Sequence, residues 1–308
     1  RIWVPPSVRW KFPKPQKLPM TTENCDAVGN TDRKPRRGER PFDPWRFPIT
    51  PSGQAFVDEV AALLEAHEED ARLRKRKRRP NDQRTFERMV SALASDLAIN
   101  ALCDEAKGFH VSRSNRHLGR VSRYGNAATS KTLRQLLDLM VAPGVALIEQ
   151  ELGFKAKNGK SRRTVVSPSA RLQQLVQQHE LAPADFGERP RPEPIELKSY
   201  PVSRTKRGQL IDYPETTLTM ALRSQVSEIN SFLTMAKLEY SGPAVMDVNK
   251  RQLRRVFTRE SFESGGRLFG GFWQPMRKHY RLSNLRINGE EVVELDYGQI
   301  MPRLVYAL

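Results

Sequence analysis

The 308-residue sequence predicts an α+β protein built from several units. Apolar residues recur at three- and four-residue spacing in several stretches, which predicts amphipathic helices. An Asn158-Gly159 turn between two apolar runs predicts a β-hairpin. The proline-rich stretches 1–52 and 181–213 interrupt both kinds of period, so we expect them to separate the packed parts of the chain.

The composition favours a polyanionic partner. The formal net charge is +17 and the pI is about 10.2, which points first to nucleic acid, although a basic tail on another kind of protein has the same effect. Cys25 and Cys103 lie far apart without metal-ligand spacing, so we expect reduced thiols. With no long apolar run and no signal-peptide pattern, we expect a cytoplasmic protein without a membrane partner.

The first 84 residues predict an arm, a helix and a basic linker. Residues 1–52 hold ten prolines, which favours a disordered arm that either docks through its aromatic residues or packs loosely. Ser52 to Leu73 has helical periodicity with Ser52 as a plausible N-cap. Seven of the eight residues from Arg72 to Arg79 are basic. That run is either a solvated linker or a set of phosphate contacts.

The segment 85–180 predicts helices followed by a hairpin. Helical patterns cover Thr85 to Cys103 and Ser130 to Val141, and strands are predicted at Val145 to Glu151 and Arg162 to Val166. A further helix is predicted from Pro168 onward.

This order of elements resembles the winged-helix DNA-binding domains of replication initiators and transcription regulators. Between residues 111 and 163 there are eleven Lys or Arg and three acidic residues. The resemblance implies a recognition helix in the major groove and a wing on the backbone. The alternative is a solvated basic face on a small helical domain. Candidate base contacts are Arg123, Lys131 and Arg134, and candidate phosphate contacts are Lys157, Lys160, Arg162 and Arg163.

The segment 214–308 predicts a long helix from Thr216 to Leu238 and a helical continuation from Asn249 to Phe257. Farther along, Ile287-Asn288-Gly289-Glu290 predicts a tight turn, and Val292 to Leu295 predicts a strand that ends at Asp296.

The residues after that strand, Asp296-Tyr297-Gly298-Gln299-Ile300-Met301-Pro302-Arg303, resemble motif A of the family A DNA polymerases, usually Asp-Tyr-Ser-x-Ile-Glu-x-Arg. Upstream, Glu263-Ser264-Gly265-Gly266-Arg267 resembles the Asp-x-x-Gly-Arg element of the related single-subunit RNA polymerases, with Glu263, Gly266 and Arg267 at its defining positions. The segment would then be an incomplete polymerase-like palm. Gly298 and Met301 depart from the motif, which leaves the choice of sugar open.

The resemblance implies a catalytic role for Asp296. Its carboxylate would bind two Mg²⁺ ions together with the backbone carbonyl of Tyr297, and Arg303 would support the following helix. The nucleotide-binding helix and the second catalytic aspartate of that family follow motif A, so we expect the chain by itself to be inactive. Three functions stay open: a truncated template-directed nucleotidyltransferase that uses nucleoside triphosphates, a non-enzymatic DNA-binding protein, and a basic scaffold for RNA.

Overall fold

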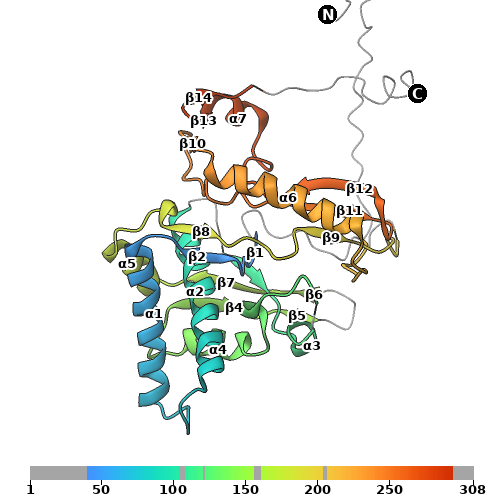
Figure 1. Ribbon diagram of the computed structural model, residues 1–308. Coiled ribbons are helices and arrows are strands. Elements are labelled where there is room, and N and C mark those ends of the chain that lie inside the picture. Colours follow the sequence, from blue (N-terminus) through green and yellow to red (C-terminus); the bar gives the residue numbers. More distant parts are fainter. Residues whose placement is uncertain (1–39, 104–107, 121, 156–160, 204–206, 294–308) are drawn as a thin grey trace, which may run out of the picture.

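The computed structural model describes residues 40–103, 108–120, 122–155, 161–203 and 207–293. These residues form a mixed α+β protein with seven α-helices and several small sheets (Figure 1). They build a first unit, residues 40–188, and a second unit, residues 195–293, which lies above the first in Figure 1. The largest apolar core belongs to the first unit, and two smaller cores belong to the second. No helix in the described ranges is long and apolar enough to span a bilayer.

Two antiparallel helices form one side of the first unit and confirm the predicted ones. Helix α1 (Pro51–Asp70) begins after Thr50, whose hydroxyl accepts a hydrogen bond from the Gly53 amide at 3.2 Å. The N-cap is therefore Thr50 and not the predicted Ser52. Helix α2 (Pro80–Leu102) starts with a proline, which has no amide proton to leave unpaired at that position.

The first unit also holds a four-stranded sheet, in the order β1-β3-β7-β4. The central strand β7 (Thr164–Pro168) pairs antiparallel with both β3 (Phe109–Val111) and β4 (Ile148–Glu151). Short helices join β3 to β4, and a β-hairpin joins β4 to β7. These connections are α3 (Asn115–Leu118), η1 (Ala127–Thr129), α4 (Leu133–Val141), β5 (Phe154–Lys155) and β6 (Ser161–Arg162). Helix α5 (Ala170–Gln178) follows β7, so β7 continues through Pro168, where the sequence predicted a helix.

The predicted arm is packed where the structure describes it. Strand β1 (Arg40–Pro41) lies parallel to β3, and β2 (Arg46–Pro48) lies antiparallel to β8 (Phe186–Glu188). The expectation of a disordered arm is therefore wrong for residues 40–52, because short strands separated by prolines satisfy their backbone groups at sheet edges. Residues 1–39 lie outside the described part of the chain.

The predicted linker 181–213 is also structured. It contains the 3₁₀ turn η2 (Pro183–Asp185), strand β8 and strand β9 (Ile195–Leu197). Phe186 and Ile195 are fully buried. The prolines that interrupt the period lie between these short strands, where they block no ladder hydrogen bond.

The second unit packs α6 (Thr217–Met235) against the sheet β9-β11-β12. Leu222 and Val226 form the buried face of this helix, which confirms the predicted helix. Strand β11 (Arg254–Thr258) pairs with β9 on one side and with β12 (Ser261–Phe269) on the other. The predicted helical continuation from Asn249 to Phe257 is thus wrong. Its last residues form a central strand, which suits their β-branched and aromatic side chains.

A small sheet completes the second unit. Strand β10 (Leu238–Tyr240) pairs with β13 (Leu285–Ile287), which pairs with β14 (Glu290–Glu291), and α7 (Lys278–Asn284) precedes β13. Asn288 and Gly289 have φ angles of 55° and 83°, which confirms the predicted tight turn. Of the predicted strand Val292 to Leu295, the first two residues are not in a strand, and the rest lie outside the described residues.

A buried charged cluster joins the two units. It consists of Arg40, Asp43, Arg46, Asp96, Glu188 and Asp247. Arg46 of β2 forms an ion pair with Asp247 of the second unit. Glu188 accepts a hydrogen bond from the Gln252 amide at 3.2 Å, which is a second link between the units. The mutual placement of the units therefore depends on compensated buried charge as well as on apolar packing.

Candidate nucleic-acid interface

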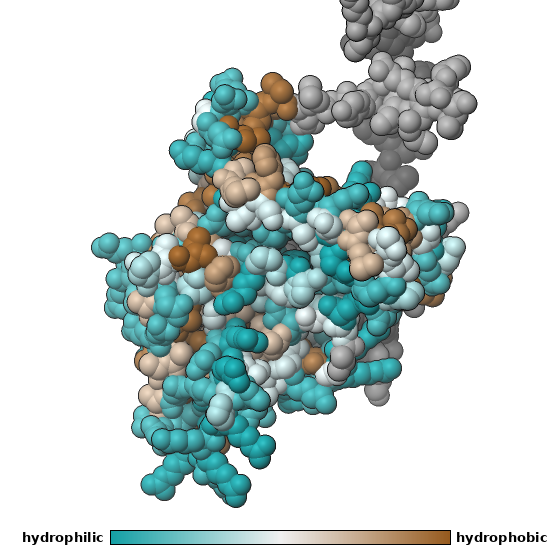
Figure 2. Space-filling model, viewed as in Figure 1, coloured by the Kyte–Doolittle hydropathy of each residue, from teal (hydrophilic) through white to brown (hydrophobic). Residues whose placement is uncertain are grey.

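The basic run lies in the loop 71–79, which joins α1 to α2 and is held at both ends. The amides of Arg72 and Leu73 donate to the carbonyls of Glu69 and Glu68, at 3.0 and 2.9 Å, and Arg72 takes a φ of 50°. These bonds satisfy the last carbonyls of α1. Pro80 then starts α2. The loop consequently projects from the lower end of the molecule in Figure 1, and Figure 2 shows this end covered by hydrophilic residues.

Two arginines anchor the loop to the helices. The guanidinium of Arg78 lies 3.6 Å from the centroid of the Phe86 ring and forms an ion pair with Glu68. Arg74 lies 3.7 Å from the same Glu68 carboxylate. The cation–π contact and the shared carboxylate give the loop a defined conformation.

The other basic residues of the loop point outward. They are exposed and have no hydrogen-bond or ion-pair partner among the residues that the structure describes: Arg72, Lys75, Arg76, Lys77 and Arg79. Five uncompensated cations on a short, anchored loop produce a local positive potential. An anion with several charged oxygens, such as a nucleic-acid backbone, suits this arrangement.

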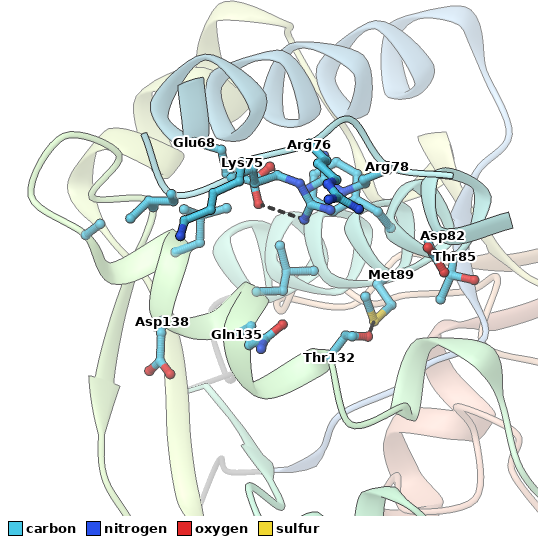
Figure 3. Close-up of a pocket in the computed structure, with 16 residues that line it drawn as sticks. Glu68, Lys75, Arg76, Arg78, Asp82, Thr85, Met89, Thr132, Gln135 and Asp138 are labelled. Atoms are coloured by element: carbon cyan, nitrogen blue, oxygen red, sulfur yellow. Dashed lines mark hydrogen bonds and ion pairs between the residues drawn. The ribbon is translucent and has the colours of Figure 1, made fainter. Parts of the chain in front are cut away.

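Helix α4 forms the other side of a groove next to this loop. The groove has a volume of about 920 Å³ and lies between the loop residues Lys75, Arg76 and Arg78 and the α4 residues Gln135 and Asp138 (Figure 3). The opposite face of α4 is buried in the core of the first unit through its leucines and Met140. The exposed face is therefore polar, and it adjoins the basic loop.

The charge on that face is positive at its start. Lys131 and Arg134 are exposed and have no ion-pair partner among the described residues, and both were predicted base contacts. Asp138 is compensated by Arg113 at 2.5 Å, and Arg113 also donates to the Gln150 side chain at 2.6 Å. Lys131 just before α4, together with Arg134 and the amide of Gln135 on the helix, is thus offered to a partner.

Of the predicted wing residues, Arg162 lies on β6 and Arg163 follows that strand. Arg162 binds the Glu151 carboxylate through both terminal nitrogens, so part of its charge is used within the hairpin. Arg163 is exposed, with one nitrogen 3.4 Å from the His110 ring. Lys157 and Lys160 lie outside the described residues.

Arg123 is placed away from this surface, in an internal ionic network. Its guanidinium binds Asp212 at 2.5 Å and Glu215 at 3.0 Å, and it lies 3.8 Å from the centroid of the Tyr213 ring. Desolvation lowers the pKa of Arg123, but hydrogen bonds to Tyr213 and Asp212 outweigh it, so the net pKa is above its usual value. This side chain joins the first unit to the second and is not part of the proposed nucleic-acid interface.

The polymerase-like residues are only partly described. Glu263, Gly266 and Arg267 lie on β12, and the carbonyl of Gly266 accepts a hydrogen bond from Arg255 at 3.1 Å. Arg267 is exposed and lines a second groove between the two units. Asp296, Tyr297 and Arg303, with the Mg²⁺ site that they imply, lie outside the described residues. Within those residues no group of three or more His, Cys, Asp or Glu has the geometry to hold a metal ion.

The basic run is evident from the sequence, but its position next to helix α4 is not. The position of the run beside α4 depends on how α1, α2 and α4 pack, and no local pattern carries that information. Comparison with protein-family models, with curated proteins and with solved structures gives no match for this chain.

Proposed function

We propose that this chain binds duplex nucleic acid, with DNA as the first candidate, through the α1–α2 loop and the exposed face of α4. The observation that carries the proposal is the set of five uncompensated cations beside a helix whose outer face is polar and basic at its start. Phosphates would contact the loop, and Lys131, Arg134 and Gln135 would face the base edges.

The order of elements supports the same proposal. Helix α4 directly precedes β4, the β5–β6 hairpin lies between β4 and β7, and β7 pairs with β3 and β4. Winged-helix domains have this order, and in helix-turn-helix domains of this kind the second helix enters the major groove. The proposed wing contacts are Arg163, with Lys157 and Lys160 as predicted from the sequence.

The test is the salt dependence of duplex binding, measured by fluorescence anisotropy with a labelled duplex of about 20 base pairs, two turns of B-form DNA. We expect the slope of log K against log salt to fall by about 2 in Lys75→Gln/Arg76→Gln, since each lost phosphate contact removes about 1. The matched control is Arg259→Gln/Arg277→Gln, which removes two exposed arginines of the second unit.

The outcome separates the two interpretations of the basic run. A solvated loop predicts the same small change in both double variants, because both lose the same net charge. An unchanged slope in Lys75→Gln/Arg76→Gln would refute phosphate contact at the loop. Lys131→Gln and Arg134→Gln then test the α4 face, where a base contact changes affinity differently for different sequences.

Template-directed nucleotidyl transfer stays a prediction from the sequence. It depends on Asp296 and Tyr297 as Mg²⁺ ligands and on nucleoside triphosphates as substrates. Calorimetric titration with Mg²⁺ in the wild type and in Asp296→Asn tests the first step. Equal Mg²⁺ affinity in the two proteins would show that Asp296 does not bind Mg²⁺ in this chain.

A further inference from the structure

A second groove lies between the two units, and we name it the inter-unit groove. Its volume is about 1420 Å³. The first unit contributes β1, Phe42 and Asp43 to one wall, and the second unit contributes Phe269 and Trp273 to the other. The groove is separate from the one beside α4, because the two share no lining residue.

We propose that the inter-unit groove binds single-stranded nucleic acid. This is a second binding site, and it does not require that α4 bind a duplex. The proposal depends on two features of the groove: its charge and its exposed aromatic residues.

The charge of the lining favours a polyanion. Seven of the lining residues are basic and two are acidic. The basic residues are Arg40, Arg46, Arg191, Lys250, Arg254, Arg267 and Arg281. Both acidic residues, Asp43 and Asp247, lie beside Arg46 and compensate its charge. Arg40 and Arg254 are compensated as well, by Asp96 at 2.7 Å and by Glu196 at 2.9 Å. The outer part of the groove keeps positive charge at Arg267, which has no ion-pair partner among the described residues.

Aromatic side chains alternate with these cations. Arg267 and Phe269 lie two residues apart on β12 and so on one face of the strand, and Phe269 pairs across the sheet with Arg254. Phe269 is 39% exposed and packs in none of the apolar cores. An exposed aromatic ring beside Arg267 offers a stacking surface for a base, with a cation for the adjoining phosphate, whereas Arg254 is paired with Glu196 at 2.9 Å.

Trp273 is held near this surface by a glycine turn. Gly270 has a φ of 131°, and a Cβ atom there would lie 2.3 Å from the carbonyl oxygen of Gln252. A Cβ atom on Gly271 would lie 2.5 Å from the Trp273 indole. The turn thus lets the backbone pass close to both groups and fixes the indole against Phe272, with ring centroids 5.4 Å apart.

A buried arginine lines the groove as well. The side chain of Arg46 is 1% exposed, yet its Nε and Nη1 atoms have no hydrogen-bond partner among the described residues. The carboxylates of Asp43 and Asp96 lie 3.8 and 4.0 Å from Nε, and Asp247 forms an ion pair with Nη2, so acids of the chain itself compensate this guanidinium. A bound strand would therefore contact the outer residues of the groove and not Arg46.

A single strand fits this site better than a duplex. The aromatic surface can be used only by bases whose faces are free, and in a duplex both faces of each base are stacked. Single-stranded RNA and DNA share the required chemistry, so both are included in the test.

The test measures anisotropy of labelled thymidine and uridine oligonucleotides of about ten nucleotides, within the usual size of such sites. We expect Phe269→Ala to lower the affinity for single strands about tenfold, from the loss of one stacked base. We expect Arg267→Gln to lower the salt slope by about 0.7, the value for one phosphate contact of a single strand. Both side chains are exposed, so both variants should fold.

Matched controls separate this site from the duplex site. Phe232→Ala removes an aromatic ring that is 64% exposed on α6, and Arg259→Gln removes an arginine outside the groove. Neither should change single-strand affinity. Quenching of indole fluorescence by the oligonucleotide should fall in Trp273→Phe.

Two results would overturn the proposal. One is unchanged single-strand affinity in both Phe269→Ala and Arg267→Gln. The other is an equal loss in Lys75→Gln/Arg76→Gln, which would mean that the loop beside α4 binds both forms. Failure of the duplex experiment alone leaves the single-strand result intact, because the two sets of variants share no residue.

Discussion

Removal of the Asp247 carboxylate is the sharpest test of how the two units are joined. Asp247→Ala leaves the Arg46 guanidinium, whose side chain is 1% exposed, without its closest ion-pair partner. The remaining carboxylates of Asp43 and Asp96 lie 3.8 and 4.0 Å from its Nε atom, beyond hydrogen-bond distance. Breaking a buried ion pair from one side typically costs about 3–5 kcal/mol. Because two acids remain nearby, we expect about 3 kcal/mol, at the lower end of that range.

Thermal unfolding followed by circular dichroism measures this loss. For a chain of this size, about 3 kcal/mol corresponds to a fall in Tm of roughly 6–12 °C, provided that unfolding is a single transition. Asp212→Ala is the matched control, since Asp212 also binds an arginine but its side chain is 79% exposed. We expect that control to cost less than about 1 kcal/mol. The double variant Arg46→Met/Asp247→Leu should remain destabilised, because it also removes the guanidinium from Asp43 and Asp96, which lie 3.8 and 4.0 Å from it. Equal losses in Asp247→Ala and Asp212→Ala would refute the reasoning.

Three further predictions concern the junction, by which we mean the contact region between the two units. Burial, and then the Asp43 carboxylate, raise the pKa of Glu188 from 4.5 to about 8. Its contribution to stability is therefore complete below pH 4.5 and is lost as the pH rises to about 8. Glu188→Gln should flatten that part of the pH profile in urea unfolding, and an unchanged profile would contradict it. Arg123→Ala should lower Tm yet leave duplex affinity within about twofold, because the Arg123 guanidinium binds acids of its own chain. A larger loss of duplex affinity, measured by anisotropy, would show that Arg123 contacts the duplex. Gly270→Ala should destabilise by about 1–3 kcal/mol in calorimetry, since alanine is strained at a φ of 131° and meets the Gln252 carbonyl; a stability equal to the wild type would show that the turn adapts.

The helices could be predicted from the sequence because their apolar period is long and unbroken. α1, α2, α4 and α6 all lie within a few residues of the predicted ranges. The Asn288-Gly289 turn was predictable for a local reason too, since both residues readily take positive φ.

The short strands were not predictable. β2, β8 and β9 have three residues each, too few for any period, and the prolines in β2 and between β8 and β9 resemble those of a linker. Their pairing partners lie far away in the sequence, as with β2 and β8. The same limit applies to the site. The basic run is visible in the sequence. Its position beside α4 and the role of Arg123 at the junction depend on tertiary packing.

The junction also decides where this chain can be divided for experiments. A piece that ends after β8 would keep Arg46 and Glu188 but lose Asp247 and the Gln252 amide that cover them. Water would reach the side of the Arg46 guanidinium that Asp247 covers, and its ion pairing would then depend on acids of the first unit, such as Asp43 and Asp96 at 3.8 and 4.0 Å. Expression of either unit alone is therefore a poor way to study the binding properties of that unit. Point variants in the intact chain are better suited to the purpose.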